Sequence, residues 1–173
     1  MKTHYTFSLL LLLLGLSYQS ISQNEGLIIK SIDDNTASYA EAAMQIWNFA
    51  ELGYQEYKST ALLQKTLKEA GFTITTGTAG MPTAFIAEYG KGKPVIGILG
   101  EYDALPGLSQ YAAPEQKAIK EGNPGHACGH NLFGVGSAAA AIAVAEWLHK
   151  TKTPGTIRFY GTPAEEGGGG KTY

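Results

Sequence analysis

The chain has 173 residues, 44% of them hydrophobic, and a formal net charge of −2. The length suits one domain of ordinary size, and this hydrophobic content is enough for a core, which argues against a disordered chain. No strongly basic segment interrupts the sequence, so nucleic acid is not expected as a partner.

The N-terminus has the pattern of an export signal. A positively charged start precedes an apolar segment of about ten residues, residues 7–16, which is too short to span a bilayer. Small residues up to Ser22 fit a signal-peptidase site, so residues 1–22 are predicted to be a signal peptide and Gln23 to begin the mature chain. The protein is therefore expected to be exported, periplasmic or secreted, without a stable membrane anchor. An uncleaved anchor is the alternative.

Residues 34–72 have the apolar periodicity of two helices, which are separated near Gly53. Ser59 is expected to cap the start of the second helix. Gly71 follows the end of that helix, at a position where glycine commonly stops helices. The apolar stripes of both helices are predicted to face the core.

Strands and one further helix are predicted in the rest of the chain. The strands are expected over residues 72–76, 83–89, 95–99 and 156–161. The third strand is continuously apolar, so it is predicted to be buried on both faces of a sheet. A polar loop over residues 106–124 leads to a helix that Asn131 can cap and that runs to about Lys150. This order of helices and strands predicts an α/β sandwich.

Side chains with metal-binding or acid–base chemistry lie at the ends of these elements. They are Glu101 and Asp103 after the third strand, Cys128 and His130 at the start of the helix, and Glu165 and Glu166 after the fourth strand. Ligands bind at the carboxyl ends of strands in open α/β sheets, so the three clusters are predicted to form one site.

Thiolate, imidazole and carboxylate are the donors that bind zinc-like divalent ions. Cys128 is the only cysteine, and metal ligation would protect its thiolate in an exported protein; a buried structural thiol is the alternative. In extended backbone, Cys128 and His130 would point to the same face, as would His126. The two histidines could instead be polar groups that are satisfied within a loop.

The adjacent carboxylates of Glu165 and Glu166 are not expected to share a role. One would bind the metal and stay ionised, while the other would accept and release the proton of a water molecule. The residues themselves leave the order of these roles open. Asp103 could bind the metal or orient an imidazole that does so, or be a turn residue before Pro106. The clusters together indicate a metallohydrolase.

Four segments of the chain resemble one family, the metal-dependent amidohydrolases related to aminoacylases, hippurate hydrolase and auxin-conjugate hydrolases. These segments are residues 49–56, 101–106, 125–131 and 161–171. Many relatives carry Asp at the position of Asn131. With Asn there, the chain resembles the p-aminobenzoyl-glutamate hydrolase branch of the family. The resemblance extends from about residue 35 to the end of the chain.

The resemblance implies ligands at Cys128, His130 and Glu166 and a general base at Glu165. Apart from the resemblance, Asp103 and His126 are predicted to lie beside the ligands and orient them. It implies two divalent metal ions, zinc or manganese, in each full-length subunit. Two further histidine ligands are also implied, and no histidine follows His149 in this sequence.

A zinc-peptidase-like, phosphorylase/hydrolase-like catalytic domain with an inserted dimerisation domain is implied as well, in a protein that forms homodimers. Residues 23–173 would be the N-terminal part of the catalytic domain, without its downstream half and without the dimerisation domain. Because the sheet would end on the strand over residues 156–161 with an unpaired edge, this part alone is predicted to be poorly folded and inactive.

The predicted activity is hydrolysis of the amide bond between an acyl or aryl group and an amino acid, in an N-acyl amino acid or a p-aminobenzoyl-glutamate-like substrate. An inactive metal-binding fragment of such an enzyme is the alternative. A thiol redox protein is less favoured, because no second cysteine is present to resolve an oxidised Cys128.

Overall fold

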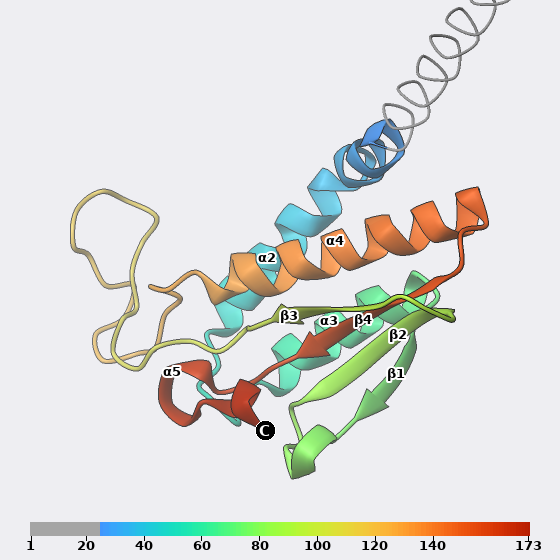
Figure 1. Ribbon diagram of the computed structural model, residues 1–173. Helices are drawn as coiled ribbons and strands as arrows, with labels where there is room; N and C mark the ends of the chain where they lie inside the picture. The colour runs from blue at the N-terminus through green and yellow to red at the C-terminus, as the bar shows by residue number, and fades with distance from the viewer. Residues whose placement is uncertain (1–24) are drawn as a thin grey trace, which may run out of the picture.

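The computed structural model describes residues 25–173 and shows helices packed on one face of a sheet (Figure 1). The predicted signal peptide, residues 1–22, lies outside the described residues. The elements in chain order are α2 (Thr36–Phe49), α3 (Tyr57–Glu69), β1 (Thr73–Thr76), η1 (Thr78–Gly80), β2 (Phe85–Lys91), β3 (Val95–Gly100), α4 (His130–Thr151), β4 (Gly155–Gly161), α5 (Glu165–Gly168) and η2 (Gly170–Thr172).

The two predicted N-terminal helices are α2 and α3, although the cap of α3 differs from the prediction. Ser59 lies within α3, and the carboxylate of Glu51 accepts hydrogen bonds from the backbone N–H groups of Lys58 and Ser59 instead. Glu51 thereby satisfies donors of the first helical turn that have no partner within the helix. Gly71 follows α3 with a left-handed φ of +91°, as expected for a helix stop.

The sheet is mixed, with strand order β1-β2-β4-β3. β2 is antiparallel to both β1 and β4, whereas β3 and β4 are parallel. β4 therefore has a partner on each side, and the prediction of an unpaired edge at this strand is wrong. The described sheet ends at β3 instead, because residues 95–100 pair with residues 156–161.

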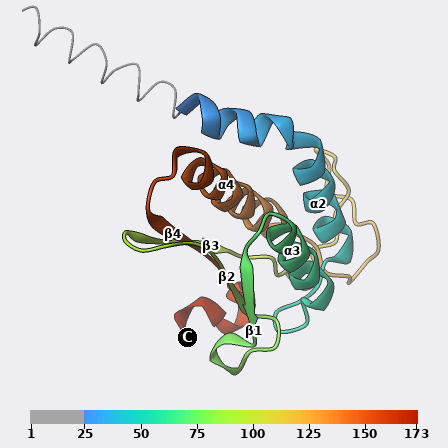
Figure 2. The same ribbon diagram turned by 90° about the vertical axis from the view of Figure 1, so that its right-hand side faces the viewer.

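α3 and α4 pack on the sheet, and α2 packs against both helices, so the helices lie on one side (Figure 2). The core contains Phe85, Ala87, Ile157 and Phe159 from the strands and Ile46, Leu63, Leu67, Ala138 and Ala141 from the helices. This arrangement confirms the predicted α/β sandwich. Val95 and Leu99 are exposed because they point to the face opposite Ile98, which packs against the core, and Ile96 is exposed on the other face of β3, an edge strand of the described sheet. The prediction that this strand is buried on both faces is therefore wrong.

α4 lies very close to the end of β3. A Cβ on Gly134 would be only 2.5 Å from the carbonyl oxygen of Glu101, so this approach requires glycine. By length and composition alone α4 could cross a membrane, but ten of its residues are buried within this fold. Its close contact with β3 places His130, one turn before Gly134, next to Glu101.

Candidate metal centre

The three clusters of reactive side chains meet at one end of the sheet. Glu101 and Asp103 follow β3, His130 is the first residue of α4, and Glu165 and Glu166 begin α5 (Figure 1). Because β3 and β4 are parallel, their carboxyl ends lie at the same edge. The predicted convergence of the clusters is therefore present in the structure.

The imidazole of His130 lies at the centre of the site and is only 4% exposed. Its Nδ1 atom lies 2.8 Å from Oδ1 of Asp103, and its Nε2 atom lies 3.0 Å from Oε2 of Glu101. Oε1 of Glu166 is 3.8 Å from Nδ1, and Oε2 of Glu165 is 3.9 Å from Nε2. One imidazole ring thus has four carboxylates around it.

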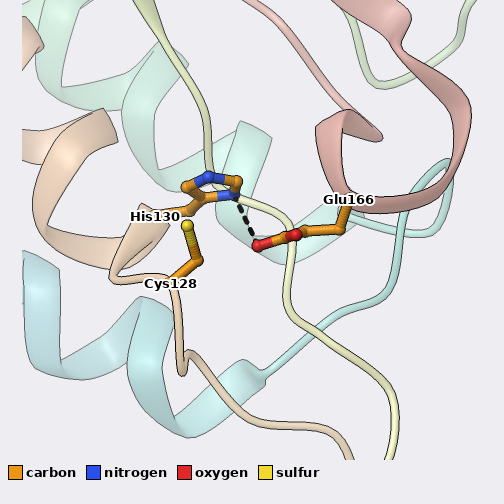
Figure 3. Close-up of side chains that lie close together, drawn as sticks. All are labelled: Cys128, His130 and Glu166. Carbon is orange, nitrogen blue, oxygen red and sulfur yellow. Dashed lines mark ion pairs between the residues drawn. The ribbon is translucent and has the colours of Figure 1, made fainter.

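Two sets of three potential metal donors share His130. The first is Cys128, His130 and Glu166, and the second is Glu101, His130 and Glu165; within each set the donor atoms lie within 4.8 Å of one another. Figure 3 shows the first set, with the Cys128 sulfur and the Glu166 carboxylate both directed toward the His130 ring. Small side-chain movements would bring the three donors into contact with one ion.

Cys128 and His130 reach the site through a turn, and not through extended backbone as predicted. Gly129 between them has a φ of +83°, and His130 already belongs to α4. A left-handed backbone at this position is most easily adopted by glycine. The turn allows an exposed thiol and a buried imidazole to face the same point.

The charge of the site favours a bound cation. Asp103 is 1% exposed and Glu101 is 5% exposed, and burying carboxylates is unfavourable without positive partners. Lys171 supplies one charge, with Nζ 2.9 Å from Oε1 of Glu101 and 3.2 Å from Oε1 of Glu165. Oε1 of Glu166 is buried without a hydrogen-bond partner and is therefore free to contact an ion.

The thiol of Cys128 also fits a metal ligand better than a free redox thiol. Desolvation, followed by the negative charge of Glu166, raises the pKa of Cys128. The reactive thiolate is therefore disfavoured until a cation offsets these carboxylates. A divalent ion would provide that charge and would use the thiolate as a ligand.

Asp103 and His126, the two residues predicted to orient ligands, lie in different surroundings. Asp103 contacts His130, and its Oδ2 atom accepts the backbone N–H of Glu166 at 2.8 Å, so one carboxylate joins two of the predicted ligands. The Nε2 atom of His126 lies 3.1 Å from the carbonyl oxygen of Ile46, within α2. Burial lowers the pKa of His126, and the structure does not bring its ring into either donor set.

Two residues at the site had no role in the sequence analysis, which placed Glu101 in a predicted cluster without a function and did not single out Lys171. Glu101 belongs to the same motif as Asp103, and its position directly after a buried-type strand was the available signal. Lys171 follows a run of glycines and has no distinguishing pattern. Its contact with Glu101 depends on the fold, because the two residues are 70 positions apart.

The sequence also matches known proteins. Residues 97–173 match the model of peptidase family M20/M25/M40. Over 144 residues the chain is 49% identical to a subunit of the p-aminobenzoyl-glutamate hydrolase of Escherichia coli (strain K12), an alignment covering 83% of this chain and 30% of that protein. The chain belongs to peptidase family M20/M25/M40. Three of the four segments lie within the M20 match, and the relative that is 49% identical covers most of the chain, so the predicted resemblance is confirmed.

A second relative, hippurate hydrolase of Campylobacter jejuni, is 30% identical over 143 residues, which is 83% of this chain and 36% of that protein. The chain thus spans about a third of the length of these curated relatives.

Among solved structures, the Bacillus subtilis YxeP protein, a dinuclear metal binding peptidase from the M20 family, superimposes with a TM-score of 0.56 at 28% identity. That superposition covers 74% of this chain and 35% of YxeP. A protein from methicillin-resistant Staphylococcus aureus has the same fold, with a TM-score of 0.69 at 20% identity, over 84% of this chain and 36% of that one.

Proposed function

We propose that the full-length protein is a metal-dependent hydrolase that cleaves the amide bond between an acyl or aryl group and an amino acid. The observation that supports this most directly is the set of Cys128, His130 and Glu166 beside a further carboxylate, Glu165, in an M20 chain. A p-aminobenzoyl-glutamate-like substrate is the first candidate, because the 49% identical relative is named for that substrate.

The metal is proposed to be zinc or manganese, with two ions in each full-length subunit. Cys128, His130 and Glu166 would hold one ion from this part of the chain. A bound divalent ion would polarise the carbonyl of the scissile amide and make water more acidic. Thiolate, imidazole and carboxylate are a donor set that suits zinc, and the carboxylates also suit manganese.

Glu165 is proposed as the general base. Its side chain is 31% exposed, so water can reach it. Its Oε1 atom bonds to Lys171 while its Oε2 atom faces the His130 ring. From this position the carboxylate would take the proton of the attacking water and pass it to the nitrogen of the leaving amine. Asp103 would hold the His130 imidazole in orientation during this step.

A cavity of about 320 Å³ beside Glu166 provides space for part of the substrate. Its lining includes the apolar side chains of Leu52, Ala104 and Pro106 and the ring of Tyr54. Pockets with apolar walls and a few polar groups are typical of small-molecule sites. This cavity would suit the acyl or aryl group better than a charged amino acid.

The test uses the full-length protein, freed of metal and then supplied with Zn²⁺ or Mn²⁺. Release of the amine from p-aminobenzoyl-glutamate and from N-acyl amino acids is measured for the wild type and for Glu165→Gln. The variant is expected to lose a factor of roughly 10² to 10⁴ in kcat while retaining its metal content. Near-wild-type turnover would remove Glu165 as the base, and metal binding without any turnover would favour the inactive metal-binding alternative.

Export and self-association are proposed alongside the activity. The N-terminal residues support export, with a mature chain that begins near Gln23. The family resemblance supports a homodimer formed through an inserted domain. The mass of the full-length protein in solution would test the homodimer, and a monomer at assay concentration would contradict it.

A further inference from the structure

Glu56 is a buried carboxylate away from the donor sets. The residue is fully buried, immediately before α3. Its Oε1 atom accepts the backbone N–H of Ala164 at 2.8 Å, and its Oε2 atom accepts the hydroxyl of Thr83 at 2.9 Å. These partners are distant in the sequence, so Glu56 joins the start of α3, the segment before β2 and the segment after β4.

The contact with Ala164 is made where the backbone needs support. Ala164 has a φ of +56°, a left-handed conformation that is unfavourable for a residue with a Cβ. Such a conformation persists when its surroundings hold it, and Glu165 and Glu166 follow directly. Gly53 packs against the same residue, since a Cβ at Gly53 would lie 2.9 Å from both Cα and Cβ of Ala164.

Thr83 extends the network to the other half of the site. Its carbonyl oxygen accepts the hydroxyl of Tyr102 at 2.6 Å and the hydroxyl of Thr60 at 2.9 Å. Tyr102 is fully buried and lies between Glu101 and Asp103 in the sequence. One buried polar network therefore contacts the residue before Glu165 and the residue between Glu101 and Asp103.

A carboxylate is an unfavourable group for this location if its role is packing alone. Burial is the largest influence on Glu56 and raises its pKa, while its hydrogen bonds act in the opposite direction. Its carboxylate is held by N–H and O–H donors. Because both carboxyl oxygens are engaged, the side chain is held in place and its bond to Ala164 fixes the direction of that N–H.

We propose that Glu56 is a positioning residue for the metal centre. Through Ala164 it holds the backbone that carries Glu165 and Glu166, and through Thr83 and Tyr102 it couples this backbone to Glu101 and Asp103. This inference rests on the proposed function of the site and adds a residue that contacts neither the ion nor the substrate.

The test replaces Glu56 by Gln in the full-length protein. The amide keeps the shape of the side chain, but its NH₂ group cannot accept a hydrogen bond, so one of the two contacts is lost. Glu51→Gln is the matched control, because the carboxylate of Glu51 lies at the same end of α3 and bonds only to Lys58 and Ser59. The bond of its backbone carbonyl to the Ala104 N–H is kept in the variant.

Zn²⁺ affinity is measured by competition with a chelator, and kcat and KM are measured well below the unfolding temperature. Glu56→Gln is expected to lower Zn²⁺ affinity or kcat by on the order of 10- to 100-fold, with KM little changed, as for other residues that orient metal ligands. Glu51→Gln is expected to lower the unfolding temperature while affinity and kcat of the folded protein stay at wild-type values. Wild-type affinity and kcat in Glu56→Gln, or equal losses in the control, would overturn the proposal.

If Glu56→Gln does not fold, Thr83→Val decides the same question, because it removes the hydroxyl donor and keeps the carbonyl that Tyr102 contacts. A smaller loss in the same direction supports the proposal, and unchanged Zn²⁺ affinity and kcat contradict it. A wild type that binds Zn²⁺ without turnover refutes the proposed function only, since the affinity comparison still stands. A wild type that binds neither Zn²⁺ nor Mn²⁺ refutes both proposals.

Discussion

The close approach of α4 to the end of β3 predicts opposite effects for two glycines of the same helix. Gly134 lies under the Glu101 backbone, where an added Cβ would meet the carbonyl oxygen at 2.5 Å. Cβ atoms essentially never come within 3.0 Å of such an atom, so Gly134→Ala must move the helix or the strand by at least about half an ångström. Gly136 has nothing within 4 Å of its own added Cβ.

The expected magnitudes follow from these distances. Replacing a helical glycine by alanine gains about 1 kcal/mol of intrinsic helix stability, which Gly136→Ala should realise nearly in full. Overpacking a close contact costs about 1–3 kcal/mol, so Gly134→Ala should be neutral or lose up to about 2 kcal/mol after the same helical gain. The two variants should therefore differ by about 1–3 kcal/mol in the free energy of unfolding.

Urea unfolding of the full-length variants, with Zn²⁺ affinity measured in parallel, checks this prediction. His130 is one helical turn before Gly134, so displacement of α4 should also weaken Zn²⁺ binding in Gly134→Ala and leave it unchanged in Gly136→Ala. If Gly134→Ala were as stable as Gly136→Ala and bound Zn²⁺ with wild-type affinity, close packing would not determine the position of His130.

Three further predictions concern the ligands, export and the isolated part of the chain. Cys128→Ala should lower both metal stoichiometry and activity, and elemental analysis that finds unchanged stoichiometry would leave the thiol with a packing role only. N-terminal sequencing of the mature protein should find Gln23, and recovery of Met1 would refute the signal peptide. Residues 23–173 produced alone should unfold with weak cooperativity, because the edge strand β3 exposes Val95, Ile96 and Leu99, and should not hydrolyse acyl amino acids with added zinc or manganese. Sharp unfolding with metal-dependent turnover would contradict this.

The sequence determined those features that depend on local patterns. Apolar periodicity placed both N-terminal helices, and alternating or continuous apolar runs placed the strands to within a few residues. A run of alanines placed α4, although the helix begins at His130 and not after an Asn131 cap. The reactive side chains were predicted at strand ends, and the structure brings Cys128, His130 and Glu166 together as the family resemblance implied. A residue that directly follows a strand lies at the end of that strand however the strands pair, so its place could be predicted without knowing the sheet order.

Tertiary structure decided which strands pair and which surfaces are covered. An apolar run such as residues 95–99 does not reveal whether its neighbours cover one face or both, and the helices here cover one. Likewise, the central position of β4 depends on its antiparallel pairing with β2, which no local signal in either strand specifies.

The supporting residues of the site were also decided only by tertiary structure. His126 has the same spacing to Cys128 as His130 has, but its ring contacts Ile46, which is 80 residues away. Glu56 and Lys171 reach Ala164 and Glu101 across 108 and 70 residues. A side chain acquires such partners from the packing of elements that are distant in sequence. Motifs and the family resemblance that they carry could therefore suggest the candidate metal donors, but not the residues that hold them in place.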